Sequence, residues 1–421
     1  MQLRDIADYV SERINSDYVE LENYITTDCL LPNKQGRTIA TNLPPKKYSL
    51  IKFQKGDILV SNIRPYLKKI WFAECNGGAS TDVLVFRAKK EHLSTYLYSV
   101  LLQDSFYEWT MKGPKGSRMP RGDKNQIMRF HIVDIAESAY PTGKIIKALN
   151  EKISLNKQIN QNLEALARQL YDYWFVQFDF PNEKGKPYKS SGGKMVYNPI
   201  LKREIPEGWE NGILSDIANI TMGQSPDGSS YNEEGDGVIF YQGSTDFGER
   251  FPKIRQYTTA PSRFAKKGDI LMSVRAPVGD LNIANNDCCI GRGLSALNSK
   301  VGSITHLYYI MLSFKDMFER KSAIGTTFGS INKDELYNLP IIKPTTKIIK
   351  LFENKCKPIF DQQMSLGYEI DSLTKQRDEL LPLLMNGQVN FDLSANIHTF
   401  ICISIKNILP LRCKIYKYII A

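Results

Sequence analysis

The chain has 421 residues, of which 42% are hydrophobic and 24% are charged, and this composition excludes an intrinsically disordered protein. At about 150 residues per domain, the length predicts two or three domains. Lysine and arginine total 55 against 45 aspartate and glutamate residues. The net charge of +10 is compatible with a polyanionic partner, although a merely basic protein would show it too. Seven cysteines without a CxxC pair indicate free thiols in a reducing compartment.

Residues 1–140 are predicted to form a domain of mixed α and β structure. Short β-rich runs at 57–60, 71–73 and 83–86 are separated by Gly, Asn and Asp, as is typical of strands joined by turns. Residues 91–110 have the pattern of a helix. The first domain is therefore expected to be α/β or α+β.

A loop rich in glycine and proline follows at 111–131, and it carries six basic residues against one acid, Asp123. Such a loop can approach DNA closely, with arginine suited to guanine edges and lysine to phosphates. A solvated basic loop is the plain alternative. The candidate DNA-binding residues of this loop are Lys112, Lys115, Arg118, Arg121, Lys124 and Arg129.

Residues 141–180 are predicted to contain a long helix with a mostly apolar seam whose positions recur in steps of three and four, which is typical of a coiled coil. An ordinary amphipathic helix packed on its own domain is the alternative. Asn156 and Asn160 fall in this seam, where a polar residue can fix register or partner. The predicted helix-pairing residues are Leu149, Ile153, Leu163 and Leu170. Residues 181–205, rich in Pro, Gly, Lys and Ser, are expected to be an ordered surface connection.

Residues 206–343 are predicted to form a second mixed domain, with β-rich runs at 238–241, 269–274 and 281–284 and a helix at 303–321. Its basic and polar loop residues are scattered, and each is a weak signal alone. The candidate DNA-binding residues are Gln224, Ser225, Tyr231, Gln242, Arg263, Lys266, Lys267, Arg275 and Arg292. Different loops on two similar domains would suit the reading of two different DNA sequences.

Residues 344–390 are predicted to contain a second long helix with the same spacing. Its helix-pairing residues are Ile359, Leu366, Ile370, Leu373 and Leu380. Pro358 is expected either to kink this helix or to mark its true start, and Asn386-Gly387 to end it. Apolar residues beside both seams suggest either further helices from a partner or burial under the protein's own loops.

The chain repeats itself. KGDILVS at 55–61 and KGDILMS at 267–273 agree at six of seven positions. Four more matches occur in the same order in both copies, among them residues 116–132 with 325–341, which agree in hydropathy pattern without a gap. The chain is therefore read as two copies of one unit. The simplest arrangement pairs the two helices antiparallel, so that a pseudo-two-fold axis relates the copies.

A search for catalytic chemistry gives negative results. There is no HExxH pair and no GxxxxGK[ST] phosphate loop. Residues 291–296 fit a loose GxGxxA pattern, but without the acidic partner a turn is expected there rather than a dinucleotide site. No catalytic residue, metal ligand or cofactor site is predicted in this chain.

With these features the chain resembles the specificity subunit of bacterial type I restriction–modification systems. The resemblance covers about residues 1–390 and rests on the paired KGDIL elements together with segments 166–188, 205–226 and 373–389. The tail, residues 391–421, departs from it, because family members usually stop soon after a Met-Asn-Gly-Gln-Val-like ending. The N-terminus has no signal-peptide core, and basic residues interrupt the apolar part of the tail, so no membrane partner is expected.

The resemblance implies an α+β fold class, with two repeated target-recognition domains, 1–140 and 206–343, and two antiparallel helical spacers, 141–180 and 344–390. Each domain would read one half of a bipartite double-stranded DNA site, and the helices would set the unread spacer. The implied partners are two methyltransferase (modification) subunits and a restriction (motor) subunit, which would carry the S-adenosylmethionine, ATP and Mg chemistry. The chain itself would be non-catalytic and cytoplasmic in a bacterium. The alternatives are a stand-alone DNA-binding or scaffold protein and a nuclease that acts alone.

Overall fold

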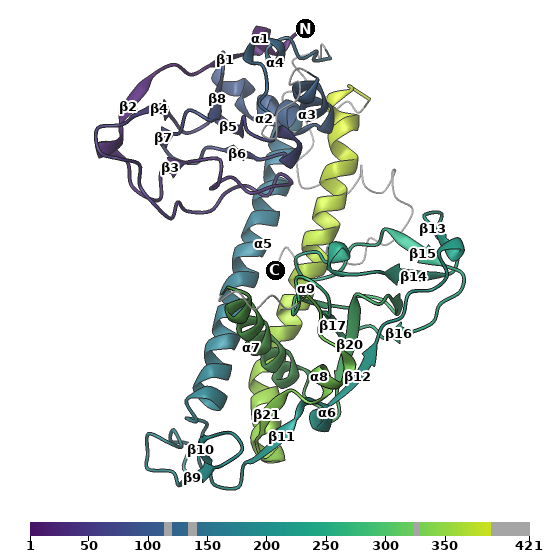
Figure 1. Cartoon of the computed structure of the whole chain (residues 1–421). Coiled ribbons are helices and arrows are strands. Elements are labelled where there is room, and N and C mark those ends of the chain that lie inside the picture. Colours follow the sequence, from purple (N-terminus) through teal and green to yellow (C-terminus); the bar gives the residue numbers. More distant parts are fainter. Residues whose placement is uncertain (113–119, 134–140, 324–328, 389–421) are drawn as a thin grey trace. The chain divides into compact units, whose positions relative to one another are not determined.

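The computed structural model describes residues 1–112, 120–133, 141–323 and 329–388, and the chain forms two compact units (Figure 1). Unit 1 comprises Met1–Leu155 and Asp371–Ala421, and unit 2 comprises Asn156–Ile370. Each unit holds one domain of sheets and short helices together with a section of both long helices. The predicted tail, 391–421, lies outside the described residues.

In unit 1, two four-stranded sheets pack with short helices. The first sheet is antiparallel and has the order β1 (Ala7–Tyr9), β8 (Val83–Ala88), β5 (Ile58–Ser61), β6 (Ile70–Phe72). The second has the order β2 (Arg13–Asn15), β4 (Ser49–Phe53), β7 (Gly77–Ala79), β3 (Tyr24–Ile25), with β3 and β7 parallel. The helices are α1 (Leu3–Ile6), α2 (Ser94–Leu102), α3 (Asp104–Met111) and α4 (Lys124–Ile127).

Unit 2 contains the same arrangement. Its four-stranded sheet has the order β12 (Ala218–Met222), β20 (Leu294–Ser299), β17 (Ile270–Ser273), β18 (Leu281–Ile283). Its five-stranded sheet has the order β13 (Tyr231–Asn232), β15 (Gln256–Thr258), β14 (Val238–Tyr241), β19 (Cys288–Ile290), β16 (Phe264–Ala265). The helices are α6 (Leu214–Ile217), α7 (Ile304–Ala323) and α8 (Lys333–Tyr337).

The two domains share a core and differ at its edge. The sheets β1-β8-β5-β6 and β12-β20-β17-β18 have the same strand order, which confirms the predicted α+β repeat. In the second sheet, β3-β7-β4 corresponds to β14-β19-β16, with one parallel and one antiparallel pair in each. Beyond this shared part, β2 adds to β4 in unit 1, whereas β15 and β13 add on the side of β14 in unit 2. The duplicated fold therefore presents two different surfaces.

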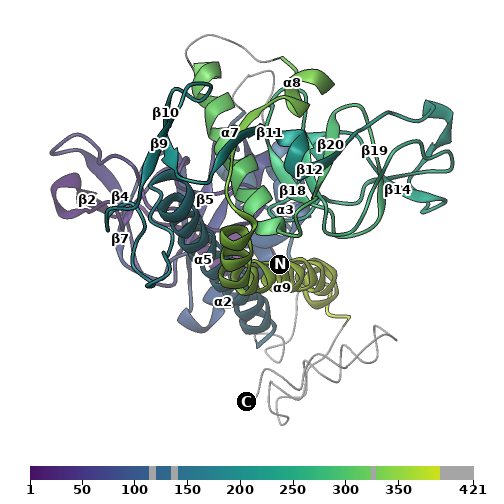
Figure 2. The same ribbon diagram turned by 90° about the horizontal axis from the view of Figure 1, so that it is seen from below.

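The long helices are α5 (Pro141–Tyr171) and α9 (Thr346–Met385). In unit 2 they run antiparallel side by side, since Gln363 Nε2 donates to Glu164 Oε2 at 2.8 Å while the rings of Trp174 and Phe352 lie 5.7 Å apart (Figures 1 and 2). In unit 1, Arg377 Nη1 donates to Asn150 Oδ1 at 2.9 Å. Of the predicted helix-pairing residues, Leu149, Ile153, Leu366 and Ile370 are buried, and Leu163, Leu170, Ile359, Leu373 and Leu380 are half-buried.

Two details of the helices bear on the sequence predictions. Asn156 and Asn160 are buried as expected of seam positions, and their role in register stays a prediction. Helix α9 begins at Thr346 and continues through Pro358, so the alternative that Pro358 marks its start is wrong. Cys356 and Phe360 are buried on either side of this proline, and their packing offsets the roughly 3 kcal/mol that an interior proline costs. The helix ends at Met385, before Gly387 with a φ of 66°.

A small hairpin forms most of the connection between the copies. Strands β9 (Met195–Asn198) and β10 (Arg203–Pro206) pair antiparallel and belong to unit 2. Buried aromatic rings attach this segment to the end of α5, with Phe180 stacked on Trp209 at 4.9 Å. This agrees with the expected ordered connection.

Candidate nucleic-acid interface

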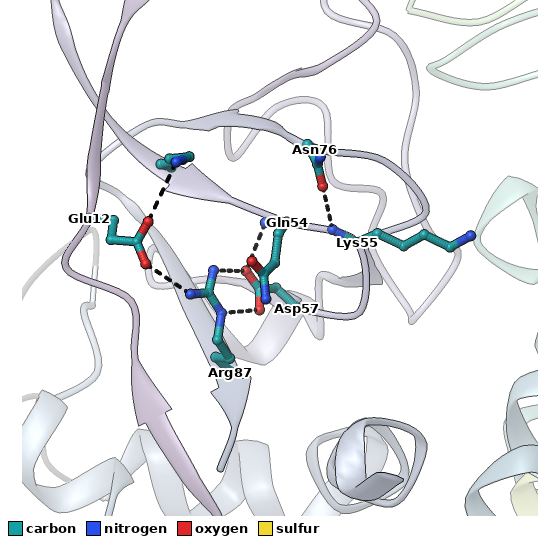
Figure 3. Close-up of polar contacts among 7 residues, drawn as sticks. Glu12, Gln54, Lys55, Asp57, Asn76 and Arg87 are labelled. Carbon is teal, nitrogen blue, oxygen red and sulfur yellow. Dashed lines mark hydrogen bonds and ion pairs between the residues drawn. The ribbon is translucent and has the colours of Figure 1, made fainter. Parts of the chain in front are cut away.

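The repeated KGD motif forms a turn that fixes a central strand (Figure 3). Asp57 is 1% exposed; its Oδ2 accepts from the Gln54 backbone N–H at 2.9 Å, and it pairs with Arg87 through Nε and Nη2, both at 2.8 Å. Arg87 also donates to Glu12 at 3.0 Å. The hydrogen bonds to Asp57 raise the pKa of the Arg87 guanidinium. Gly56 allows the turn with a φ of 94°.

Unit 2 repeats this turn with a weaker partner. Asp269 Oδ2 accepts from the Lys266 N–H at 2.8 Å, and its Oδ1 accepts from Asn298 Nδ2 at 3.3 Å. Burial raises the pKa of the Asp269 carboxyl. Lys267 N–H donates to Asp287, and its Nζ lies 5.4 Å from the ring centre of Tyr368 on α9. The motif is thus structural, and the Lys267 ammonium lies against the helix.

A turn at residues 290–293 brings together candidates from four separate segments. The Ile290 carbonyl accepts from the Gln224 N–H at 3.0 Å, and the Ile290 N–H donates to the Arg263 carbonyl at 2.9 Å. The Arg292 N–H donates to Ser225 Oγ at 3.3 Å. This turn, named the reading turn below, carries Arg292 between β19 and β20, and the expected turn at the GxGxxA pattern is confirmed.

Glycines let the backbone of Gln242 pack directly on the reading turn. A Cβ on Gly291 would lie 3.1 Å from the Cα and the carbonyl oxygen of Gln242, and a Cβ on Gly293 would lie 2.6 Å from that oxygen. The contact at Gly293 is too short for a Cβ against this backbone oxygen, and the contact at Gly291 is tighter than most Cβ contacts. Gln242 and Arg292 therefore start from adjacent points of the backbone, and both side chains are exposed.

Both domains place an arginine at the end of the four-stranded sheet where one central strand, β5 or β17, ends and the other, β8 or β20, begins. In unit 1, Arg121 forms an isolated backbone β-bridge with Ile63, which follows β5, and the Arg121 Nη2 lies 3.1 Å from Asp82 Oδ1. In unit 2, Arg275, which follows β17, forms the β-bridge with Ser330, and the neighbouring Val274 N–H donates to the Gly293 carbonyl at 2.9 Å. We name these places the arginine edges. Arg275 and Arg292 thus lie near one another on unit 2.

The other candidates take different places. Lys115 and Arg118 lie outside the described residues. Lys112 lies over the Trp109 ring and Lys124 over the Tyr9 ring, at 5.6 and 5.9 Å, and Arg129 and Lys266 are exposed. Tyr231 stacks on Phe240 at 4.8 Å and donates to the Pro226 carbonyl, so it is a packing residue.

Sequence reasoning missed Arg64, which is exposed beside Arg121. Its N–H donates to the Pro120 carbonyl at 2.9 Å, and its φ of 50° is left-handed. A residue before proline is usually extended, so the sequence held no signal for this conformation.

Among the described residues, no group of three or more His, Cys, Asp or Glu side chains could hold a metal ion. No helix in the same part of the chain is long and apolar enough to cross a membrane. The described surfaces instead offer arginine and amide groups on rigid loops, which are donors and acceptors suited to nucleic acid.

Comparison with known proteins agrees with this chemistry. Residues 206–379 match the family model described as the type I restriction modification DNA specificity domain. The protein assigned as the MjaX specificity subunit of a type I restriction enzyme in Methanocaldococcus jannaschii is 30% identical, over 82% of this chain and 80% of its own length. The HindI specificity subunit of a type I restriction enzyme from Haemophilus influenzae is 25% identical, over 92% and 98%.

A solved structure supports the fold. The S subunit of a type I restriction–modification system from M. genitalium has a TM-score of 0.54 and 13% identity, covering 91% of this chain and 95% of that one.

Proposed function

Because the chain belongs to the family of type I restriction enzyme specificity subunits, we propose that it is the DNA-reading subunit of such an enzyme. Each recognition domain would bind one half of a bipartite double-stranded site. The observation that carries this proposal is one core built twice, with different strands around it and a recurring β-bridge that bears an arginine in each copy, on opposite members of the bridge.

The charges of the two edges support DNA binding. No described residue forms an ion pair with the side chain of Arg64 or Arg275, and both are exposed. The Arg121–Asp82 pair is 62% and 38% exposed, so it contributes little to stability and can open toward a phosphate. Unpaired arginines on rigid backbone supply the sequence-independent part of DNA affinity.

We assign the methylation and cleavage chemistry to partner subunits: two methyltransferase subunits, with S-adenosylmethionine, and a restriction subunit, with ATP and Mg. On α5 in unit 2, Ile159 and Leu166 are 37% and 52% exposed, and a step of seven residues places them on one helix face. Tyr173, in the π-helical turn Asp172–Val176 that follows α5, is 37% exposed. An apolar face of this kind suits a protein partner. The length of α5 and α9 would set the unread spacer.

Replacing Arg275 or Arg121 with alanine tests this assignment. Each change should weaken binding of the chain, assembled with its methyltransferase, to cognate DNA by about 1 kcal/mol or more, because an arginine contact is lost. Footprinting should show the loss on one half-site for R121A and on the other for R275A. The control K355A removes an exposed cation of α9 and should leave affinity unchanged.

Unchanged affinity in both arginine variants would remove the arginine edges from the DNA-contacting surface. Purification from the native cell without any methyltransferase would instead favour a stand-alone DNA-binding protein.

A further inference from the structure

The reading turn of unit 2 is rigid. Its backbone is held from three sides, by Gln224, Arg263 and Gln242, through the hydrogen bonds and close glycine contacts given above. Two serine hydroxyls add further hydrogen bonds. Ser225 Oγ accepts from the Arg292 N–H, and Ser262 Oγ donates to the Gln224 carbonyl at 2.6 Å. The backbone from which these side chains project is therefore fixed before any ligand binds, which lowers the entropic cost of binding.

The side chains on this rigid frame are uncommitted. Gln224, Gln242, Arg263 and Arg292 are all exposed, and no described residue forms a hydrogen bond or ion pair with any of their side chains. Two other arginines of unit 2 behave differently. Arg255 Nε donates to Asp246 at 2.7 Å, and Arg250 Nη1 lies 3.2 Å from Glu164 Oε2. Unlike Arg250 and Arg255, the four exposed side chains at the reading turn have no described hydrogen-bond or ion-pair partner, which indicates a surface that is available to a ligand.

We propose that the reading turn recognises purine edges in the major groove of the half-site bound by unit 2, guanine through Arg292 and adenine through Gln242, with Arg263 and Gln224 exposed beside them. This inference rests on the proposed function. A guanidinium pairs in bidentate fashion with guanine O6 and N7, and a glutamine amide pairs similarly with adenine N6 and N7. Two neutral amides would add little to phosphate binding, so their presence among the arginines favours base contacts.

The corresponding place in unit 1 has different chemistry. The Ser80 N–H donates to the Ile25 carbonyl at 2.9 Å, as the Gly291 N–H does to the Tyr241 carbonyl at 2.8 Å. Thr26 and Thr81 therefore stand at the positions of Gln242 and Arg292, with Asp82 at that of Gly293. Hydroxyls and a carboxylate cannot form the arginine–guanine pair. The purine reading by arginine and glutamine is thus expected on one half-site alone.

The test is selection of DNA from a pool with randomised half-sites by the assembled complex, using the wild-type chain, R292A, R292K, Q242A and the control K355A. We expect R292A to lose its preference for guanine at one position by roughly ten- to a hundredfold, and Q242A to lose its preference for adenine at another. R292K should recover part of the guanine preference. K355A should select the wild-type sequences. All four variants should unfold at the wild-type temperature, because the altered side chains have no described partners.

Three results would overturn the inference: an equal loss of binding to all sequences in R292A, which would mean a phosphate contact; selection unchanged in both R292A and Q242A; or lost preferences at positions occupied by pyrimidine in the strand contacted. Failure of the proposed function looks different, since the wild-type complex itself would then select no sequence.

Discussion

Replacing Asp57 with alanine should lower the free energy of unfolding of unit 1 by about 3 kcal/mol, because the change leaves the Arg87 guanidinium without its buried partner. Asp57 is 1% exposed and accepts three hydrogen bonds, two from Arg87 and one from the Gln54 N–H. Arg87 retains Glu12 and is 28% exposed, so water and this second carboxylate limit the loss. Denaturant titration that is monitored by hydrogen exchange in β5 measures the change in the free energy of unfolding.

The matched control for this change is Asp269→Ala in unit 2. Asp269 occupies the same turn, but its side-chain partner is the neutral Asn298 at 3.3 Å rather than an arginine. Its replacement should lower the free energy of unfolding by about 1 to 2 kcal/mol, because the hydrogen bonds from the neutral Asn298 amide and from the Lys266 backbone N–H are lost. Equal losses in D57A and D269A would contradict the ion pair as the source of the difference.

Acid should destabilise unit 2 through His306. This side chain is 1% exposed, and its ring lies 4.6 Å from that of Phe175 and 6.4 Å from that of Phe352. Burial lowers its pKa from 6.5 to about 3. Between these values the unfolded chain binds a proton that the folded chain does not, so the free energy of unfolding falls as the pH is lowered through this window. The full loss is on the order of 5 kcal/mol.

The variant H306L tests this assignment, because leucine fills an apolar site without titrating. Urea unfolding at pH 7 and at pH 4 should show a markedly smaller acid loss in H306L than in the wild-type chain. H131L, which changes an exposed histidine of unit 1, should keep the wild-type acid dependence. An acid loss that is the same in H306L and the wild-type chain would contradict a neutral His306 in the folded state.

The repeat and its elements could be predicted because they depend on local patterns. The predicted strands at 57–60, 83–86 and 269–274 overlap β5, β8 and β17, since short apolar runs between turns leave few other structures. The spacing of the long helices was likewise sufficient, because a seam of period 3.5 needs one continuous buried face. Pro358 was harder to place, because its cost is offset by packing that the sequence does not reveal.

The candidate interface could be predicted in part only. Arg292 and Gln242 lie 50 residues apart in the chain, and their meeting depends on the parallel pairing of β14 with β19. No local pattern predicts such a pairing. Lys267 was an equally good candidate by charge, but its Nζ lies over Tyr368. The extra strands β13 and β15 could not be distinguished from loops, since each is two or three residues long.

The central claim is that the two recognition domains read the two halves of one DNA site. Mapping methylated adenines across the genome of a host that expresses this chain with its methyltransferase subunits tests it most directly. The predicted result is one bipartite motif with two unlike halves, separated by a fixed number of unspecified base pairs. A single uninterrupted motif, or a genome left unmethylated by the assembled complex, would contradict it.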